Sequence, residues 1–228
     1  MTRDTLYAIN NTNLIVALDV DTFDRARYFV DKLYPSVGIF KVGFQLFTAA
    51  GPRVIEYIRN KGAEVFLDLK FYDIPNTVAC AVRQSVRLDI RMITVHISGG
   101  KEMVSAAAQA ARTEAKLLRR RRPLLIGVTV LTSRETSPAD VLKLAREGMA
   151  SGLDGVVCSA REVRLLRKTI KKKFIIVTPG IRPKTSPHDD QKRTATAEEA
   201  LNAGSDYLVV GRPILEAGDP LKAVENIL

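Results

Sequence analysis

Acidic and basic side chains alternate in one short stretch of the sequence. Asp68 and Lys70 are two positions apart, and Asp73 follows three residues later. Residues two apart on a strand face the same side, so a strand here would bring Asp68 and Lys70 together. Carboxylates on both sides of a lysine favour its protonated form, which suits a proton donor better than an amine nucleophile. The carboxylates could stress a substrate anion or stabilise positive charge nearby.

Two more charged residues lie near the ends of apolar, strand-like runs. Asp19 ends the first run, and Lys41 lies near the end of the second. If these strand ends meet at one rim, Lys41 and Lys70 can pair with Asp19 and with the carboxylates of the first stretch. A structural ion-pair network is the alternative. We favour a functional site, because dense networks of buried charge usually mark one.

A second group of residues predicts a phosphate site. Pro179-Gly-Ile-Arg182 follows the seventh apolar run, and Gly211-Arg212-Pro213 follows the eighth. Glycine lets the backbone approach an anion, arginine offers a fork of donors, and proline suits the first turn of a short helix. Loops after strands seven and eight form a recurrent phosphate site in barrels. A simple Gly-Arg turn at a strand end is the alternative.

The polar stretch 184–193 is long for a barrel loop and has no apolar periodicity. We interpret it as a lid that closes on a ligand, with Gln191 as the group that reaches the ligand; a surface insertion is the alternative. His96, at the end of the fourth run, fits a packing or hydrogen-bonding role at least as well as catalysis. Cys80 and Cys158 are expected to be small buried hydrophobes.

Eight short apolar runs alternate with longer amphipathic stretches. Most of these runs are continuously apolar, as expected for parallel strands that are buried on both faces. The strand-like runs are 14–19, 38–43, 64–69, 92–96, 124–131, 155–159, 174–178 and 207–211. One helix-like stretch starts at Thr22, and the others cover 52–60, 76–88, 101–118, 137–150, 160–170, 196–202 and 220–227.

This alternation predicts a single α/β domain over residues 1–228, a (β/α)8 TIM barrel of near-minimal size. A doubly wound open sheet is the alternative, but no G-x-G-x-x-G motif follows the first run. In a barrel the carboxyl ends of all strands meet at one rim, where active sites lie. The charged residues named above all fall at such ends.

Composition narrows the class of protein. The net charge of +10 favours an anionic partner. Seven cations lie in the runs Arg119–Arg122 and Lys171–Lys173, which we interpret as solvated helix ends rather than a nucleic-acid patch. Two Cys and two His predict neither a disulfide framework nor a zinc cluster, although a carboxylate-bound Mg²⁺ remains open. No run has the length of a membrane span, and residues 1–13 lack a signal-peptide core, so we expect a cytoplasmic protein.

The run DLKFYDIPNT, from Asp68 to Thr77, resembles the signature of the orotidine 5′-monophosphate decarboxylases. Further segments match in family order: ALD ending at Asp19, KVG from Lys41, VHISGG from Val95, VLTS from Val130, TPGIR ending at Arg182 and VGRP from Val210. Related phosphosugar decarboxylases share the DxKxxD core. The longer run combined with GIR and VGRP is the more specific match.

The resemblance implies a carboxy-lyase that needs no cofactor or metal and converts orotidine 5′-monophosphate to UMP and CO2, the last step of de novo UMP biosynthesis. By matching positions, Lys70 would protonate C6 of the pyrimidine, and Asp68 would face the departing carboxylate. Asp68 could act by ground-state stress or by electrostatic preorganisation. Lys41 and Asp19 would bind ribose hydroxyls and orient the charged groups.

The resemblance also implies a homodimer with its sites at the subunit interface. Asp73 and Thr77 would reach in from the neighbouring subunit, and Thr132 would read the pyrimidine with Pro179 packed near it. The phosphate would be held by Arg182, Gln191, Gly211 and Arg212. Two alternatives remain: a Mg²⁺-dependent phosphosugar decarboxylase on the same barrel, and a non-catalytic, basic nucleic-acid-binding barrel.

Overall fold

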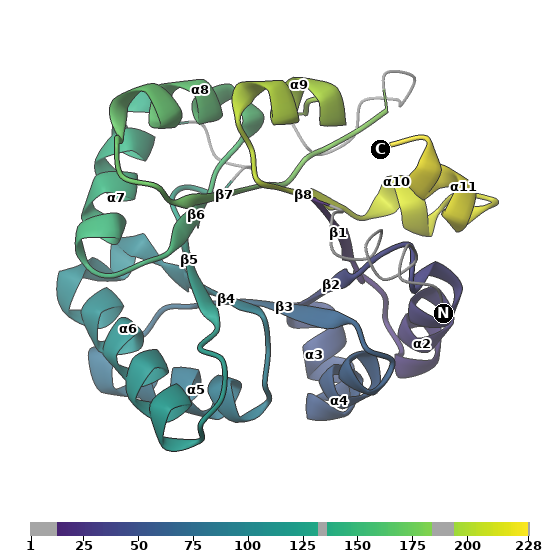
Figure 1. Ribbon diagram of the computed structural model, residues 1–228, viewed down its shortest axis with the longest axis horizontal. Coiled ribbons are helices and arrows are strands. Elements are labelled where there is room, and N and C mark those ends of the chain that lie inside the picture. Colours follow the sequence, from purple (N-terminus) through teal and green to yellow (C-terminus); the bar gives the residue numbers. More distant parts are fainter. Residues whose placement is uncertain (1–12, 132–135, 184–193, 228) are drawn as a thin grey trace.

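The strands of the protein close into a parallel barrel. The computed structural model describes residues 13–131, 136–183 and 194–227. Each strand pairs with the next in sequence order, and the eighth pairs with the first (Figure 1). This closure confirms the (β/α)8 prediction and excludes the open sheet. The strands are β1 (Leu14–Ala17), β2 (Ile39–Gly43), β3 (Glu64–Phe71), β4 (Met92–His96), β5 (Leu124–Val128), β6 (Gly155–Val157), β7 (Ile175–Thr178) and β8 (Tyr207–Val210).

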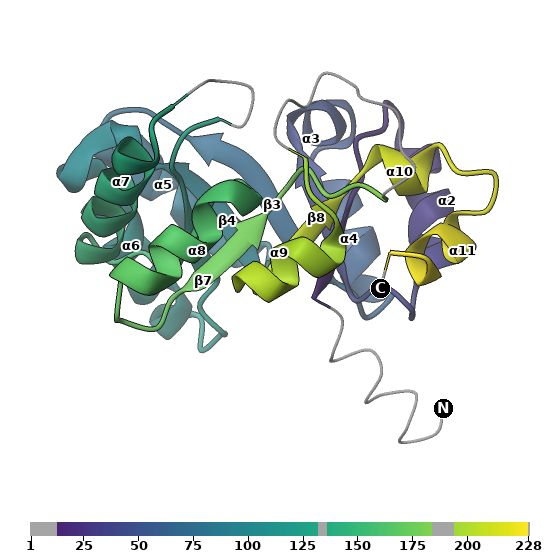
Figure 2. The same cartoon turned by 90° about the horizontal axis from the view of Figure 1, so that it is seen from above.

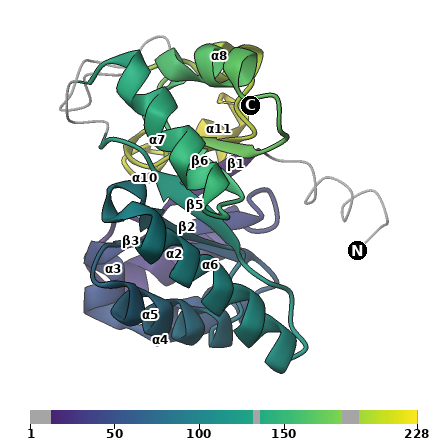
Figure 3. The ribbon, with the colours of Figure 1, turned by 90° about the vertical axis from the view of Figure 1, so that its left-hand side faces the viewer.

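Helices surround the barrel (Figures 1 and 2). Along one side, α4, α5, α6 and α7 follow one another (Figure 3). None of the helices in the described ranges is long and apolar enough to cross a membrane. The helices are α2 (Phe23–Leu33), α3 (Phe44–Ala50), α4 (Pro52–Asn60), α5 (Pro75–Arg87), the 3₁₀ helix η1 (Ile97–Gly99), α6 (Gly100–Leu117), α7 (Pro138–Ala150), α8 (Ala160–Thr169), α9 (Ala197–Ala203), α10 (Arg212–Leu215) and α11 (Pro220–Glu225).

Side-chain caps fix the starts of several helices. Thr22 accepts the N–H of Arg25 at the start of α2, and Ser137 caps α7, with a proline in its first turn. At the start of α9, Thr196 and Glu199 form a capping box. The sequence identified these starts to within one residue, whereas it did not predict α3 and η1, which are short and directly follow strands.

Two apolar layers lie on either side of the strands. Alternate residues point outward and pack against the helices, as Leu67 does. The residues between them point inward and fill the barrel: Ile15, Ala17, Ile39, Phe66, Met92, Ile126, Val177 and Val209. Because strand residues alternate, Lys41 lies two positions beyond the inward-facing Ile39. The strands that supply the inner core therefore also direct charged side chains toward the mouth of the barrel.

The run Arg119–Arg122 follows the end of α6, and its first three residues are exposed, as predicted, although Arg120, Arg121 and Arg122 also bind protein partners. One expectation about surface residues needs correction. Cys80 is exposed, because it falls on the outer face of α5, while Cys158 is buried as expected. The run Lys171–Lys173 is exposed, as predicted.

Candidate active site

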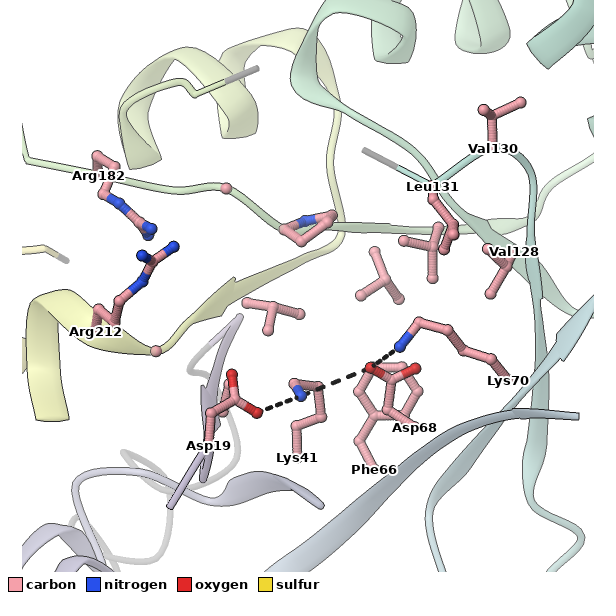
Figure 4. Close-up of a pocket in the computed structure, with 17 residues that line it drawn as sticks. Asp19, Lys41, Phe66, Asp68, Lys70, Val128, Val130, Leu131, Arg182 and Arg212 are labelled. Atoms are coloured by element: carbon pink, nitrogen blue, oxygen red, sulfur yellow. Dashed lines mark hydrogen bonds and ion pairs between the residues drawn. The ribbon is translucent and has the colours of Figure 1, made fainter. Parts of the chain in front are cut away.

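A cavity of about 230 Å³ opens at the carboxyl ends of the strands (Figure 4). Both predicted clusters, the aspartate–lysine group and the Gly-Arg group, contribute to its walls. Apolar side chains lie between them. The cavity is lined by Ala17, Asp19, Lys41, Phe66, Asp68, Lys70, Val128, Val130, Leu131, Val157, Val177, Pro179, Gly180, Arg182, Val209, Gly211 and Arg212.

Four charges of alternating sign form a chain along one wall of the cavity (Figure 4). The Nζ atom of Lys41 lies 3.0 Å from Oδ1 of Asp19 and 3.6 Å from Oδ2 of Asp68. The Nζ atom of Lys70 lies 2.8 Å from the same Oδ2. The side chains of Lys41 and Asp68 are each only 11% exposed. The structure therefore confirms that these four predicted residues form one network.

Two glycines leave room for this chain of charges. A Cβ atom at Gly43 would lie 3.1 Å from Nζ of Lys41, two positions earlier on β2. A Cβ atom at Gly211 would lie 3.4 Å from Oδ2 of Asp19. The first distance is tight, so a side chain at position 43 would push against the ammonium of Lys41, whereas a Cβ at position 211 would just touch the carboxylate of Asp19.

Asp68 is the most buried carboxylate of the network. Burial alone would raise the pKa of Asp68, but the ammonium groups of Lys41 and Lys70 hold that pKa below its ordinary value. Hydrogen bonds from Lys70 and from Thr94 act in the same direction. A fixed anion therefore sits beside a fixed cation in a cavity with apolar walls.

Sequence reasoning missed Thr94. Its hydroxyl donates to Oδ1 of Asp68 at 3.0 Å and accepts the backbone N–H of Lys70 at 2.8 Å. Thr94 lies on β4 between Met92, which points into the barrel, and His96 at the strand end. Residues two apart on a strand face the same side, so the sequence could have indicated that the hydroxyl of Thr94 faces inward like Met92.

Asp73 and Thr77 lie beside the cavity rather than in its wall. Among the described residues, Asp73 forms no ion pair with either lysine of the network, so the expected pairing of Asp73 within one chain is wrong. Its carboxylate instead accepts the N–H of Ile74 at 2.6 Å. The loop after β3 carries Asp73 outward to a neighbouring hollow, which Lys70 and Thr77 also line.

His96 lines that same hollow. Its ring lies 5.6 Å from the ring of Tyr72, centroid to centroid. Burial and the nearby ammonium of Lys70 lower the pKa of His96, which favours the neutral ring at neutral pH. This packing against Tyr72 agrees with the packing role that the sequence allowed.

The predicted phosphate residues gather at the opposite end of the cavity. Arg182 and Arg212 extend toward each other there (Figure 4). The backbone N–H of Arg182 donates to the carbonyl of Ala195 at 2.9 Å, which ties the segment after β7 to the segment before α9. Pro179 and Gly211 also line this end. Thr132 and Gln191, with the stretch 184–193, lie outside the described residues.

This arrangement suits a ligand with an anionic group at one end and a flat, apolar body. The two guanidinium groups can hold an anion, the valines can pack against a ring, and the chain of charges lies beyond the ring. A (β/α)8 barrel with such a cavity at its strand ends is typical of barrel enzymes that act on small anionic substrates. The chain belongs to the orotidine 5′-phosphate decarboxylase / HUMPS family, whose model matches residues 12–227.

Individual relatives agree with this assignment. The chain is 48% identical to an orotidine 5′-phosphate decarboxylase from Moorella thermoacetica, over 94% of this chain and 90% of the relative. It is 49% identical to one from Syntrophotalea carbinolica, over 94% of this chain and 93% of the relative. A crystal structure of the Lactobacillus acidophilus enzyme matches with a TM-score of 0.81 and 38% identity, over 94% of this chain and 96% of that one.

Proposed function

We propose that this chain decarboxylates orotidine 5′-monophosphate to UMP, with Lys70 as the proton donor. The bond between C6 and the carboxylate breaks, CO2 leaves, and the electron pair that remains on C6 takes a proton from the ammonium of Lys70. The observation that carries this proposal is the contact of 2.8 Å between Lys70 and Asp68 at the cavity wall. A cation held there can stabilise negative charge at C6 before it donates its proton.

Asp68 has two possible effects on the substrate carboxylate. The buried anion of Asp68 raises the energy of a second carboxylate bound beside it, and this repulsion ends when CO2 leaves. The same anion fixes the ammonium of Lys70 in place before the reaction, which lowers the cost of reorganisation. Lys41 and Asp19, the next pair in the chain of charges, would bind ribose hydroxyls.

The other end of the cavity would bind the phosphate. Arg182 and Arg212, which line this end together with Gly211, would hold the dianion through charge-assisted hydrogen bonds. The family resemblance adds Gln191 to this group. Thr132 would read the pyrimidine, and Pro179 would pack near it. Binding energy from a phosphate far from C6 can be used to desolvate and orient the reacting end.

The test is the loss of ultraviolet absorbance when the protein is mixed with orotidine 5′-monophosphate, with and without EDTA. We expect catalytic turnover at the same rate in both samples. The two oxygens of Asp68 already contact Lys41, Lys70 and Thr94, which favours a reaction without Mg²⁺. Loss of turnover in EDTA would favour the Mg²⁺-dependent alternative, and no turnover in either sample would contradict the proposal.

We propose further that the protein is a homodimer in which Asp73 and Thr77 complete the partner's site. Large apolar side chains beside these residues are exposed: Phe44 by 58%, Tyr72 by 63% and Ile74 by 66%. An exposed apolar patch of this kind favours a protein interface. A two-fold axis through it would use the patch on both subunits and would turn each Asp73 toward the other chain.

Mixing two inactive variants tests the shared site. A dimer with one Lys70→Ala subunit and one Asp73→Ala subunit contains one site with both native residues. We expect dissociated and reassociated mixtures to recover up to about a quarter of wild-type activity, while each variant alone stays inactive. Mixtures that stay inactive although they form dimers would contradict the shared site.

A further inference from the structure

Strand β3 bulges where it carries the catalytic pair. Leu67 pairs with Ile93 on β4, and the next pair along the strands is Phe71 with Val95. Three residues of β3, positions 68–70, therefore lie opposite Thr94 alone. A β-bulge bends a strand and changes where its side chains point, and bulges are frequent beside active sites.

The bulge holds Lys70 in an unusual backbone conformation. The φ angle of Lys70 is +43°, in the left-handed region that lysine rarely adopts. Such a conformation persists only where surrounding contacts enforce it. The backbone N–H of Lys70 donates to Oγ1 of Thr94 at 2.8 Å, so Thr94 supplies one of those contacts from the facing strand.

The same hydroxyl also holds the partner carboxylate. Oγ1 of Thr94 lies 3.0 Å from Oδ1 of Asp68. The directions of both bonds are fixed, because an ionised carboxylate only accepts and a backbone N–H only donates. A single hydroxyl thus connects the backbone of Lys70 to the carboxylate that binds the Lys70 ammonium. Thr94 is fully buried, so water does not compete for these bonds.

We propose that Thr94 is a positioning residue for the decarboxylation, which aims the ammonium of Lys70 by fixing both its backbone and its carboxylate partner. This inference rests on the proposed function. Thr94 is absent from the lining of both cavities that Lys70 borders, so it acts through Lys70 and Asp68 rather than on the substrate.

The test compares Thr94→Val with Thr94→Ser. Valine keeps the shape of threonine but removes the hydroxyl, so Lys70 and Asp68 lose their common partner. We expect kcat to fall by about 10²-fold, because small misplacements of a reacting group have effects of that size. The KM is expected to stay within about threefold of wild type, because Thr94 does not line the cavity. Thr94→Ser retains the hydroxyl and is expected to recover most of kcat.

The pH profile separates positioning from general damage. The hydrogen bond from Thr94 helps to lower the pKa of Asp68, so its removal raises that pKa. The acid limb of kcat/KM should therefore move to higher pH in Thr94→Val and return in Thr94→Ser. Thr129→Val is the matched control. Thr129 is also a buried threonine near the strand ends, but its hydroxyl donates to the carbonyl of Val157, and it does not line the cavity.

Three outcomes would overturn the inference. The first is wild-type kcat and an unshifted acid limb in folded Thr94→Val. The second is an equal loss of kcat in Thr129→Val. If Thr94→Val does not fold, Thr94→Cys replaces it, because a thiol of similar size is only a weak donor and acceptor. The third outcome is wild-type kcat in Thr94→Cys. Absence of turnover by wild type, measured alongside, would instead remove the proposed function and the inference with it.

Discussion

The two rims of the barrel both carry ion pairs, but they use them differently. At the N-terminal rim, where the strands begin, Asp154 accepts the N–H of Leu125 at 2.9 Å and both arms of Arg122 at 2.7 Å. Asp206 repeats the pattern two strands further on: it accepts the N–H of Ile176 at 2.6 Å and pairs with Arg167. Each carboxylate therefore joins a neighbouring strand to an arginine.

At the C-terminal rim, where the strands end, the carboxylates pair with lysines that face a cavity. Lys41 and Lys70 are point charges with protons that can be transferred, whereas the guanidinium of an arginine such as Arg122 keeps its proton and binds in a fixed fork. The N-terminal rim thus uses the cation suited to a permanent link. The C-terminal rim carries the cation suited to proton transfer. The N-terminal rim therefore contributes to stability, and the C-terminal rim carries the chemistry.

The largest expected effect comes from Lys70→Ala. Removal of the ammonium should lower kcat by at least about 10²–10⁴-fold, because a general acid alone contributes that much. The absorbance assay measures the rate, and circular dichroism checks that the variant is folded. Turnover near the wild-type rate in a folded Lys70→Ala would mean that the C-terminal rim does not act as proposed.

Arg212→Ala should have the next largest effect. It would remove the proposed charge-assisted hydrogen bonds to the phosphate, each contributing about 1.5–3 kcal/mol, which corresponds to roughly 10- to 150-fold in kcat/KM. Steady-state kinetics with orotidine 5′-monophosphate would measure the loss. The rate with a substrate that lacks the phosphate, measured with inorganic phosphite added, gives a second readout of the phosphate site. Unchanged kcat/KM would remove Arg212 from the phosphate site.

At the N-terminal rim, Arg167→Ala should change stability and leave chemistry alone. It deprives the half-buried Asp206 of its charged partner, which should lower the free energy of unfolding by about 1–3 kcal/mol. Urea unfolding measures that change, and kcat/KM of the folded variant should equal that of wild type. A loss of kcat/KM without a loss of stability would contradict the assignment of stability, rather than chemistry, to the N-terminal rim.

Arg121→Ala should have the smallest effect of the set. Its guanidinium pairs with Glu64 at 2.9 Å, but the Arg121 side chain is 60% exposed. Exposed ion pairs contribute about 0–1 kcal/mol. The same unfolding experiment should place this variant close to wild type. A loss as large as that of Arg167→Ala, whose side chain is 28% exposed, would show that exposure of the arginine is not what distinguishes the two pairs.

Much of this division could be predicted from the sequence. Strand parity placed Asp68 and Lys70 on the same face. The positions of Lys41, Arg182 and Arg212 at or after strand ends placed them at the same rim. These predictions succeed because alternation along a strand is a local property, and because parallel strands of a barrel all end at one rim.

The remainder depends on pairing between distant segments. The bulge opposite Thr94 arises from the register of β3 against β4, which no local pattern specifies. The same holds for Arg122, whose partner Asp154 lies 32 residues away in sequence. Asp73 was assigned to the network by its spacing from Lys70, but the loop after β3 turns it outward.

The most direct test of the account measures kcat/KM and the unfolding midpoint on the same preparations of Lys70→Ala and Arg122→Ala. Lys70→Ala should lose at least about 10²-fold in kcat/KM and remain folded with a cooperative transition. Arg122→Ala should unfold at a lower temperature, by about 2–4 °C for each kcal/mol of stability lost, and keep wild-type kcat/KM. Retained activity in folded Lys70→Ala, or a comparable loss of activity in folded Arg122→Ala, would contradict the account.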